Sequence, residues 1–310
     1  MRKTFAKIAT LAVAVLFATS LAMASEQGHF QKTLQVSGTA DLQVFTHSGD
    51  VTIRPGPAST ISITGRIHVG DGWFVGLSSG GRKGEVAAIE NNPPIQQSGN
   101  SVRIDYVNHR NISVDYEITA PPDTKVRTKS GSGDQTIEGM QAGVDVETGS
   151  GDVKLNDLAG DIRIHTGSGN VQARGAAGPF EARAGSGDIT IEEKAKGDVR
   201  VETGSGNIEA RGVDGGLNAS TGSGDVRVDG TPANSWYVKT GSGNAELRLP
   251  QESAFDLDVS TSSGSVEVNH PVTTTVQGRV EETRKTIRGK VRGGGPEINV
   301  HTGSGDVHVD

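Results

Sequence analysis

Short apolar columns repeat along the chain on both sides of a Gly-Ser-Gly step. Six and four residues before the serine the positions are apolar, as in Val199 and Val201 before Ser205. Three and five residues after it they are apolar again, as in Ile208 and Ala210. Because side chains alternate between the two sides of a strand, this period of two predicts two short strands joined by a turn, each with one buried face.

The Ser-Gly-Asp/Asn step recurs at intervals of 18 or 19 residues. Its seven regular copies begin at Ser132, Ser150, Ser168, Ser186, Ser205, Ser223 and Ser242. A fixed period of this kind is typical of solenoids, in which each repeat stacks on its neighbours. Each half of a repeat ends on glycine, which tolerates the positive φ that a tight corner often needs. The pattern predicts an all-β fold, a parallel β-solenoid with coils of about 18 residues and two short strands each.

Outward positions of neighbouring repeats alternate in charge. The two columns are Asp145, Arg163, Glu181, Arg200 and Asn156, Arg174, Glu192, Arg211, Asp229, Arg248. Opposite charges on adjacent strands contribute about 0.2 to 1 kcal/mol each and help to fix the stacking. A catalytic role for these carboxylates is the alternative, but each one has a neighbour in its column that accounts for it.

The first 24 residues have the pattern of a secretory signal peptide. Three basic residues precede an apolar run over 8–21, which ends in a small-residue Ala-Met-Ala site. We therefore expect the mature chain to begin at Ser25 and to be exported to the periplasm, the cell surface or the medium. Without the leader, 27 Lys+Arg stand against 37 Asp+Glu, a net charge near −10. Such an acidic chain is a poor nucleic-acid partner.

Composition excludes several other classes of protein. The sequence has no cysteine, so it lacks disulfides and thiolate metal sites. No second apolar run reaches the roughly 20 residues that span a bilayer. The 44 glycines and 4% aromatic residues do not suit a thick globular core, whereas a narrow solenoid interior can be filled by Val, Ile and Ala.

Breaks in the pattern divide the chain. The expected organisation is a signal peptide at 1–24, an N-terminal β region at 25–129, regular solenoid repeats at 130–250, and C-terminal coils with a capping segment at 251–310. An irregular glycine-rich insertion at 70–100 carries Trp73, Phe74 and a short helix over 85–90. It is expected to be a lid over one end of the solenoid, because solenoid ends need caps, or else a binding loop.

A locally basic segment follows at 270–296, which contains six Lys and Arg residues and only two acidic residues. It is interpreted as a solvated hairpin whose charges keep a terminal edge from pairing, with contact to an anionic envelope surface as the alternative. A last copy of the repeat, His-Thr-Gly-Ser-Gly-Asp at 301–306, closes the chain at Asp310.

Three stretches resemble a known family. The step Val-Glu-Thr-Gly-Ser-Gly-Asn-Ile at 201–208 is similar to the repeat of the bacterial DUF4097 family, whose members also carry an adhesin label. The stretch Ala-Ile-Glu-Asn-Asn-Pro-Pro-Ile at 88–95 and the stretch Asn-Ile-Ser-Val-Asp-Tyr-Glu at 111–117 resemble the upstream part of some members. The resemblance covers most of the mature chain. It implies a β-repeat fold and brings no catalytic motif.

Calcium binding is one chemistry weighed against that resemblance. A turn column of carboxylate and amide oxygens could supply ligands: Asp134, Asp152, Asn170, Asp188, Asn207, Asp225 and Asn244. The sequence lacks the Gly-Gly-x-Gly-x-Asp pattern of calcium-binding rolls, and the alternation of Asp with Asn reduces like-charge repulsion. No metal site is therefore predicted.

Two enzymatic interpretations also fit poorly. A carbohydrate lyase or hydrolase needs acids and bases clustered in a cleft, whereas here they are dispersed along columns. A serine hydrolase of the α/β class needs a Gly-x-Ser-x-Gly elbow, and none is present. We predict no enzymatic activity, no catalytic residue and no cofactor.

The sequence favours an exported β-solenoid that presents flat sheets to an envelope or extracellular macromolecule, a glycan or a protein, as the adhesin label of the resembling family implies. The alternative is a periplasmic carbohydrate-binding or carbohydrate-active β-helix, which an exposed aromatic row would favour. The regular array has only Phe180, Trp236 and Tyr237 as aromatic residues. The predicted partner-binding residues are Arg163, Arg174, Arg200, Arg211, Trp73 and Phe74.

Overall fold

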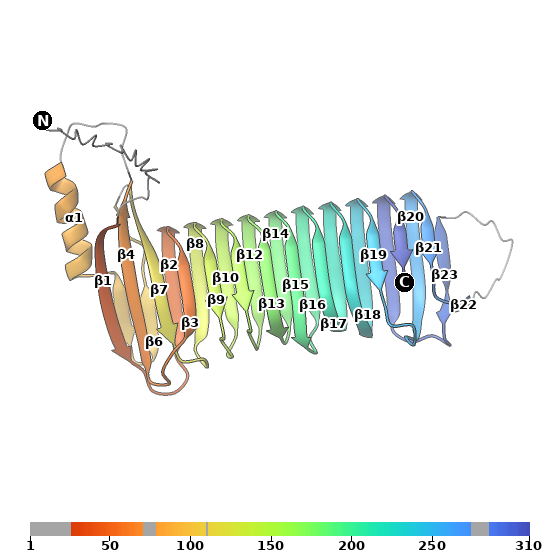
Figure 1. Ribbon diagram of the computed structural model, residues 1–310, viewed down its shortest axis with the longest axis horizontal. Helices are drawn as coiled ribbons and strands as arrows, with labels where there is room; N and C mark the ends of the chain where they lie inside the picture. Colours follow the sequence, from red (N-terminus) through yellow and green to blue (C-terminus); the bar gives the residue numbers. More distant parts are fainter. Residues whose placement is uncertain (1–25, 71–78, 110, 274–284) are drawn as a thin grey trace, which may run out of the picture.

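The computed structural model describes residues 26–70, 79–109, 111–273 and 285–310 (Figure 1). The predicted signal peptide lies outside these residues. They form one helix and 25 strands in a single sheet that folds back on itself. The prediction of an all-β, solenoid-like fold is confirmed.

The strands form two ladders, which are the two walls of the solenoid. In the first ladder all neighbours are parallel. Its order along the long axis is β6 (Ser101–Ile104), β2 (Asp41–Ser48), β8 (Lys125–Ser132), β10 (Val144–Ser150), β12 (Ile162–Ser168), β14 (Phe180–Ser186), β16 (Val199–Ser205), the second halves of β17 (Ile208–Ser223) and β18 (Val226–Ser242), β24 (Glu297–Ser304) and β20 (Phe255–Ser263). We call its outward side the first face.

The second ladder is also parallel between neighbours. Its order is β7 (Ile112–Ala120), β3 (Val51–Pro55), β9 (Gln135–Glu138), β11 (Val153–Asn156), β13 (Val171–Ala177), β15 (Ile189–Ala195), the first halves of β17 and β18, β19 (Ala245–Arg248), β25 (Val307–Val309) and β21 (Val266–Val268). We call its outward side the second face.

The core lies between the ladders and runs the length of the molecule. The predicted apolar columns are buried, including Val199, Val201, Ile208 and Ala210. The interior is narrow, so β-branched and small side chains fill most of it. The largest fully buried side chain is Trp236, whose Nε1 donates to the carbonyl oxygen of Gly215 at 3.0 Å.

The ends of the solenoid differ from the parallel expectation. At one end β1 (Glu26–Gln35) pairs antiparallel with β4 (Thr60–Val69), β4 pairs antiparallel with β7, and β5 (Ile95–Ser98) pairs antiparallel with β6. At the other end β23 (Thr286–Val291) pairs antiparallel with β20 and with β22 (Val272–Thr273). The parallel array therefore ends in reversed strands at both ends.

The order of coils in space also departs from chain order. The coil of β24 and β25 lies between the coil of β18 and β19 and that of β20 and β21 (Figure 1). The last copy of the repeat in the sequence, at 301–306, therefore lies inside the array rather than at its end. The outermost coil there carries Ser265 in the turn, where the regular coils carry Asp or Asn.

Helix α1 (Ser79–Asn91) contains the predicted helix over 85–90 and packs against β1 at one end of the long axis (Figure 1). Its Val86 and Ile89 are buried, and the Glu90 Oε1 accepts a hydrogen bond from the backbone N–H of His29 at 2.9 Å. A Cβ on Gly28 of β1 would lie 2.5 Å from Val86, so the glycine lets the helix approach.

The turn column of Asp and Asn forms a continuous hydrogen-bond ladder. The Oδ1 of Asp152 accepts from the backbone N–H of Asn170 at 2.8 Å, and the Oδ1 of Asn170 accepts from that of Asp188 at 2.9 Å. The same bond links the other coils from Asp115 to Ser265. Asp and Asn share this acceptor oxygen, which explains why either residue serves.

The glycine before each serine is required by close approach between coils. A Cβ built on this glycine would lie 2.5 to 2.6 Å from the carbonyl oxygen of the matching glycine in the preceding coil of the stack. This holds for Gly149, Gly167, Gly185, Gly204, Gly222, Gly241 and Gly303. None of these seven has a positive φ. Contact between stacked backbones therefore excludes any side chain at this glycine. The expectation of a positive φ concerned the glycine after the serine, and it is confirmed at Gly133, Gly187, Gly224, Gly243 and Gly305.

Candidate functional site

The four predicted arginines lie on opposite walls of the solenoid. Arg163 (β12) and Arg200 (β16) are exposed on the first face, with Glu181 of β14 between them in register. Arg174 (β13) and Arg211 (β17) are exposed on the second face, with Glu192 of β15 between them. The predicted register of alternating charges is confirmed, but the arginines form two pairs rather than one patch.

The arginine side chains pair mainly along their own strands. Arg200 Nη2 lies 2.6 Å from Glu202 Oε1, whereas its Nε lies 3.9 Å from Glu181 on the neighbouring strand. Likewise, Arg163 pairs with Asp161 at 3.2 Å. Residues two apart on a strand face the same side, so a carboxylate there competes with the cross-strand partner. In the described part of the chain Arg174 has no ion pair.

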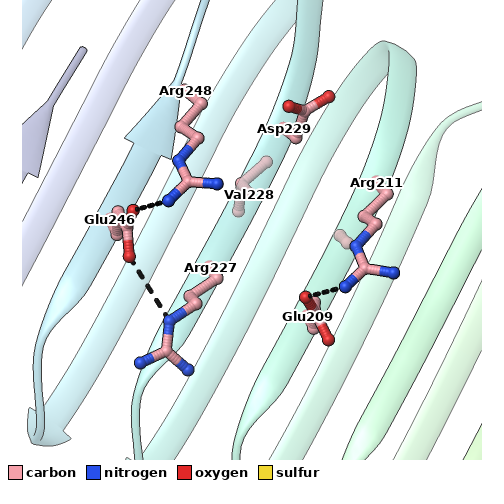
Figure 2. Close-up of a pocket in the computed structure, with 8 residues that line it drawn as sticks. Glu209, Arg211, Arg227, Val228, Asp229, Glu246 and Arg248 are labelled. Carbon is pink, nitrogen blue, oxygen red and sulfur yellow. Dashed lines mark hydrogen bonds and ion pairs between the residues drawn. The ribbon is translucent and has the colours of Figure 1, made fainter.

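A shallow hollow on the second face joins three successive strands (Figure 2). Glu246 of β19 lies between two arginines, with Arg248 at 2.6 Å and Arg227 of β18 at 3.3 Å. Arg211 of β17 bonds Glu209 at 2.5 Å. The hollow holds about 100 Å³, well below the roughly 300 to 1,000 Å³ of small-molecule sites. It suits contact with a surface rather than enclosure of a substrate.

The first face has a comparable hollow around its own arginine pair. It holds about 170 Å³ and is lined by Arg163, Arg200 and Glu181, with Pro179 and Asp198 at the corner. Both hollows mix guanidinium and carboxylate groups and are open to solvent. Such surfaces offer ionic and hydrogen-bonding groups to a macromolecule.

The basic segment at 270–296 is partly neutralised by the strand that it covers. In the described residues Arg288 of β23 bonds Asp258 of β20 at 2.8 Å, and Lys290 bonds Asp256 at 2.9 Å. The Lys290 ammonium lowers the pKa of the Asp256 carboxyl below its usual range. These contacts favour the interpretation as a hairpin that protects an edge. Residues 274–284 lie outside the described residues.

The aromatic candidates are separated by burial. Trp73 and Phe74 lie outside the described residues. Phe180 and Trp236 are buried in the core, whereas the Tyr237 side chain is 42% exposed on the first face. The array therefore shows no aromatic row of the kind that the carbohydrate alternative needs, but it does present one exposed ring.

A second group of rings was not anticipated from the sequence. Tyr106 stacks on His47 with 4.5 Å between ring centroids and lies 5.8 Å from Phe45, and the guanidinium of Arg103 sits 4.4 Å from the Phe45 centroid. Because these groups come from β2, from β6 and from the loop after β6, no local pattern reveals them. They pack against each other and cover the outward side of β2.

One buried acid stands apart from both faces. Glu193 of β15 is 7% exposed in a corner of the solenoid. Burial is the main cause that raises the pKa of Glu193 to about 8, and the nearby carboxylates of Asp214 and Asp198 act in the same direction. No cluster of three or more His, Cys, Asp or Glu suited to a metal ion occurs among the described residues.

Comparison with protein families gives a match over most of the chain. The family model described as Toastrack DUF4097 matches residues 37–192 and again residues 143–310. A crystal structure described as a "putative cell adhesion protein" from Clostridium sporogenes aligns with 91% of this chain and 98% of its own, at 11% identity and a TM-score of 0.24. The comparison with curated proteins found no match. No helix in the described residues is long and apolar enough to cross a membrane.

Proposed function

The chain belongs to the Toastrack DUF4097 family, and from that premise we propose that it is an exported, non-enzymatic adhesin or scaffold of the cell envelope. In this proposal each coil of two short strands adds one row of outward side chains to each face. The partner is an extended macromolecule that binds along a face. Export through the leader at 1–24 is part of the proposal.

The observation that carries this proposal is the structural use of the repeated polar groups. The turn Asp and Asn oxygens accept backbone N–H groups from neighbouring coils. Several buried threonines donate to glycine carbonyls of the adjacent coil, as Thr203 does to Gly187 at 3.0 Å and Thr221 to Gly206 at 2.9 Å. What recurs without such an internal role is the outward pattern of Arg and Glu, which is repeated over a rigid length.

The arginines are the groups that we propose to contact the partner. Guanidinium groups present several donors in a fixed plane and bind carboxylates or other anionic groups in pairs. The ion pairs that they form on the faces are solvent-exposed, and exposed pairs contribute only about 0 to 1 kcal/mol. A partner can therefore replace the intramolecular carboxylate at small cost.

Two double variants test the proposal, because the structure separates the arginines by face. The purified mature chain is incubated with the producing cell's envelope fraction, and the retained amount is compared with Arg163→Gln/Arg200→Gln and with Arg174→Gln/Arg211→Gln. We expect one double variant to lose most of its retention while its circular dichroism stays β-rich. Retention of both at the wild-type level would contradict the role of the arginines.

Two further results bear on export and on activity. N-terminal sequencing of material from fractionated cells should find Ser25 as the first residue, outside the cytoplasm. Depolymerisation of an acidic polysaccharide by the purified protein, abolished by one substitution without unfolding, would replace the scaffold proposal with an enzymatic one.

A further inference from the structure

We infer that the first face carries a glycan-binding patch centred on Tyr237, and that it accepts an extended, uncharged, N-acetylated glycan. The inference rests on the proposed function, in which a face binds an extended macromolecule, and it concerns a stretch of the first face that carries no arginine. The patch is formed where β17, β18 and β24 run side by side, and its members are Asn218, Ser220, Tyr237, Lys239, Asn299 and His301.

The register brings two amides to either side of the exposed ring. Asn218 pairs in register with Tyr237, and Tyr237 pairs with Asn299. Parallel strands lie about 4.8 Å apart, so the two amides are about 10 Å from each other with the ring between them. This span is comparable to a disaccharide unit.

The side chains of this row have hydrogen-bonding capacity that the protein does not use. Among the described residues, neither amide side chain nor the Tyr237 hydroxyl forms a hydrogen bond or ion pair with another part of the chain. Lys239 in the neighbouring row is also unpaired, whereas His301 Nδ1 lies 3.0 Å from Ser260 Oγ. At the equivalent positions of other strands on the first face, most charged side chains form ion pairs, as Arg183 and Arg200 do with Glu202.

Charge marks the limits of the patch. On one side it borders Arg200, which is paired with Glu202, and on the other it borders Asp258, which is paired with Arg288. Within the six side chains that we assign to the patch, Lys239 carries the single permanent charge. A partner that binds there must therefore offer hydroxyl or amide groups rather than a row of charges.

Sugars have the chemistry that such a surface recognises. The ring face of tyrosine packs against the apolar C–H side of a pyranose, and its hydroxyl supplies a polar handle. Asparagine amides donate and accept at once, which suits hydroxyl and acetamido groups on both sides of the ring. Because the sheet is flat, the ligand must be an extended chain rather than a compact sugar.

The test measures binding of chitohexaose, an uncharged β-1,4-linked N-acetylglucosamine hexamer, to the full mature chain by isothermal titration calorimetry. Tyr237→Ala should weaken binding about tenfold, in line with the contribution of aromatic contacts. Tyr237→Phe keeps the ring and should stay within about twofold. The joint variant Asn218→Ala/Asn299→Ala should also weaken binding, and Gln172→Ala on the second face serves as the control that leaves it unchanged.

The outcomes separate this inference from the proposed function. Binding of chitohexaose with a selective loss in Tyr237→Ala, at an unchanged melting temperature, supports the patch. If chitohexaose does not bind, or binds Tyr237→Ala as well as the wild type, the inference is wrong, even where the envelope fraction still retains the protein. Binding of polygalacturonate in place of chitohexaose also overturns it, since the patch lacks the charge for an acidic polymer.

Discussion

Replacing Gly167 by alanine should destabilise the solenoid without touching its core or its faces. The residue precedes the exposed turn residue Ser168. A Cβ at position 167 would lie 2.6 Å from the carbonyl oxygen of Gly149 in the preceding coil. Both atoms belong to backbone segments or are fixed to them, so no rotamer change relieves the contact. The two coils must separate locally.

The cost follows from what that separation disturbs. Inserting a methylene into a packed region costs about 1 to 3 kcal/mol. The nearby bonds from Asn170 N–H to Asp152 Oδ1 at 2.8 Å and from Val153 N–H to the Asn170 carbonyl at 2.8 Å join the same two coils and would lengthen, and each contributes about 0.5 to 1.5 kcal/mol. We therefore expect Gly167→Ala to lower the free energy of unfolding by about 2 to 4 kcal/mol.

Urea denaturation followed by circular dichroism measures this loss. The matched control is Ser168→Ala at the next position, where the side chain is exposed and makes no hydrogen bond in the described structure. A surface change of that kind should stay within about 0.5 kcal/mol. If Gly167→Ala unfolds at the same urea concentration as Ser168→Ala, close approach of the coils is not the reason for the glycine.

Three other predictions concern single groups. Asp152→Ala removes the acceptor of the Asn170 N–H and should cost about 1 kcal/mol in urea denaturation, whereas Asp152→Asn keeps the acceptor and should match the wild type. Added calcium should leave the melting temperature unchanged, because the turn oxygens already accept backbone bonds; a melting temperature that climbs with calcium would show them to be ligands. The Glu193 pKa of about 8 lies above its usual 4.5, so the folded state holds the proton more tightly and stability falls as pH rises from about 4.5 to about 8. Glu193→Gln should flatten that pH profile and raise the free energy of unfolding at pH 9 by roughly 2 to 4 kcal/mol; a profile that is equally steep in the variant would show that another group titrates.

The regular part of the fold could be predicted because one local rule repeats. The apolar columns around Ser205 lie in the core as the alternation indicates, and Asp145, Arg163 and Glu181 align across strands. Because the repeat is 18 or 19 residues long and the turn position is fixed, each coil can stack on the next in only one strand register. Contact distances between stacked backbones cannot be read from the pattern, so the sequence did not explain the glycine before each serine.

The ends could not be predicted, because they depend on long-range pairing. Nothing local to β24 reveals that it inserts between β18 and β20, since all three carry the same repeat. The antiparallel direction of β4 and β23 depends on the path of the loops that lead to them. Similarly, the Tyr237 patch needs the register of β24 against β18 before Asn299 reaches the ring.

The sequence argument predicted two strands per coil joined by a turn, but it did not apply this to the candidate arginines. Arg163 precedes that turn and Arg174 follows it, so the two side chains lie on opposite walls. Because the chain reverses at the Gly-Ser-Gly turn, the outward residues before the serine form the first face and those after it form the second face. Experiments on binding must therefore treat each face separately.

The central claim, that an outward face binds the partner, is tested most directly by mapping arginine modification. The mature chain is treated with phenylglyoxal, with and without the envelope fraction that retains it, and each arginine is quantified by mass spectrometry. The account predicts protection of both arginines of one face, either Arg163 with Arg200 or Arg174 with Arg211, while the other two are modified at the same rate in both samples. Equal modification of all four arginines, whether or not the fraction is bound, would contradict it.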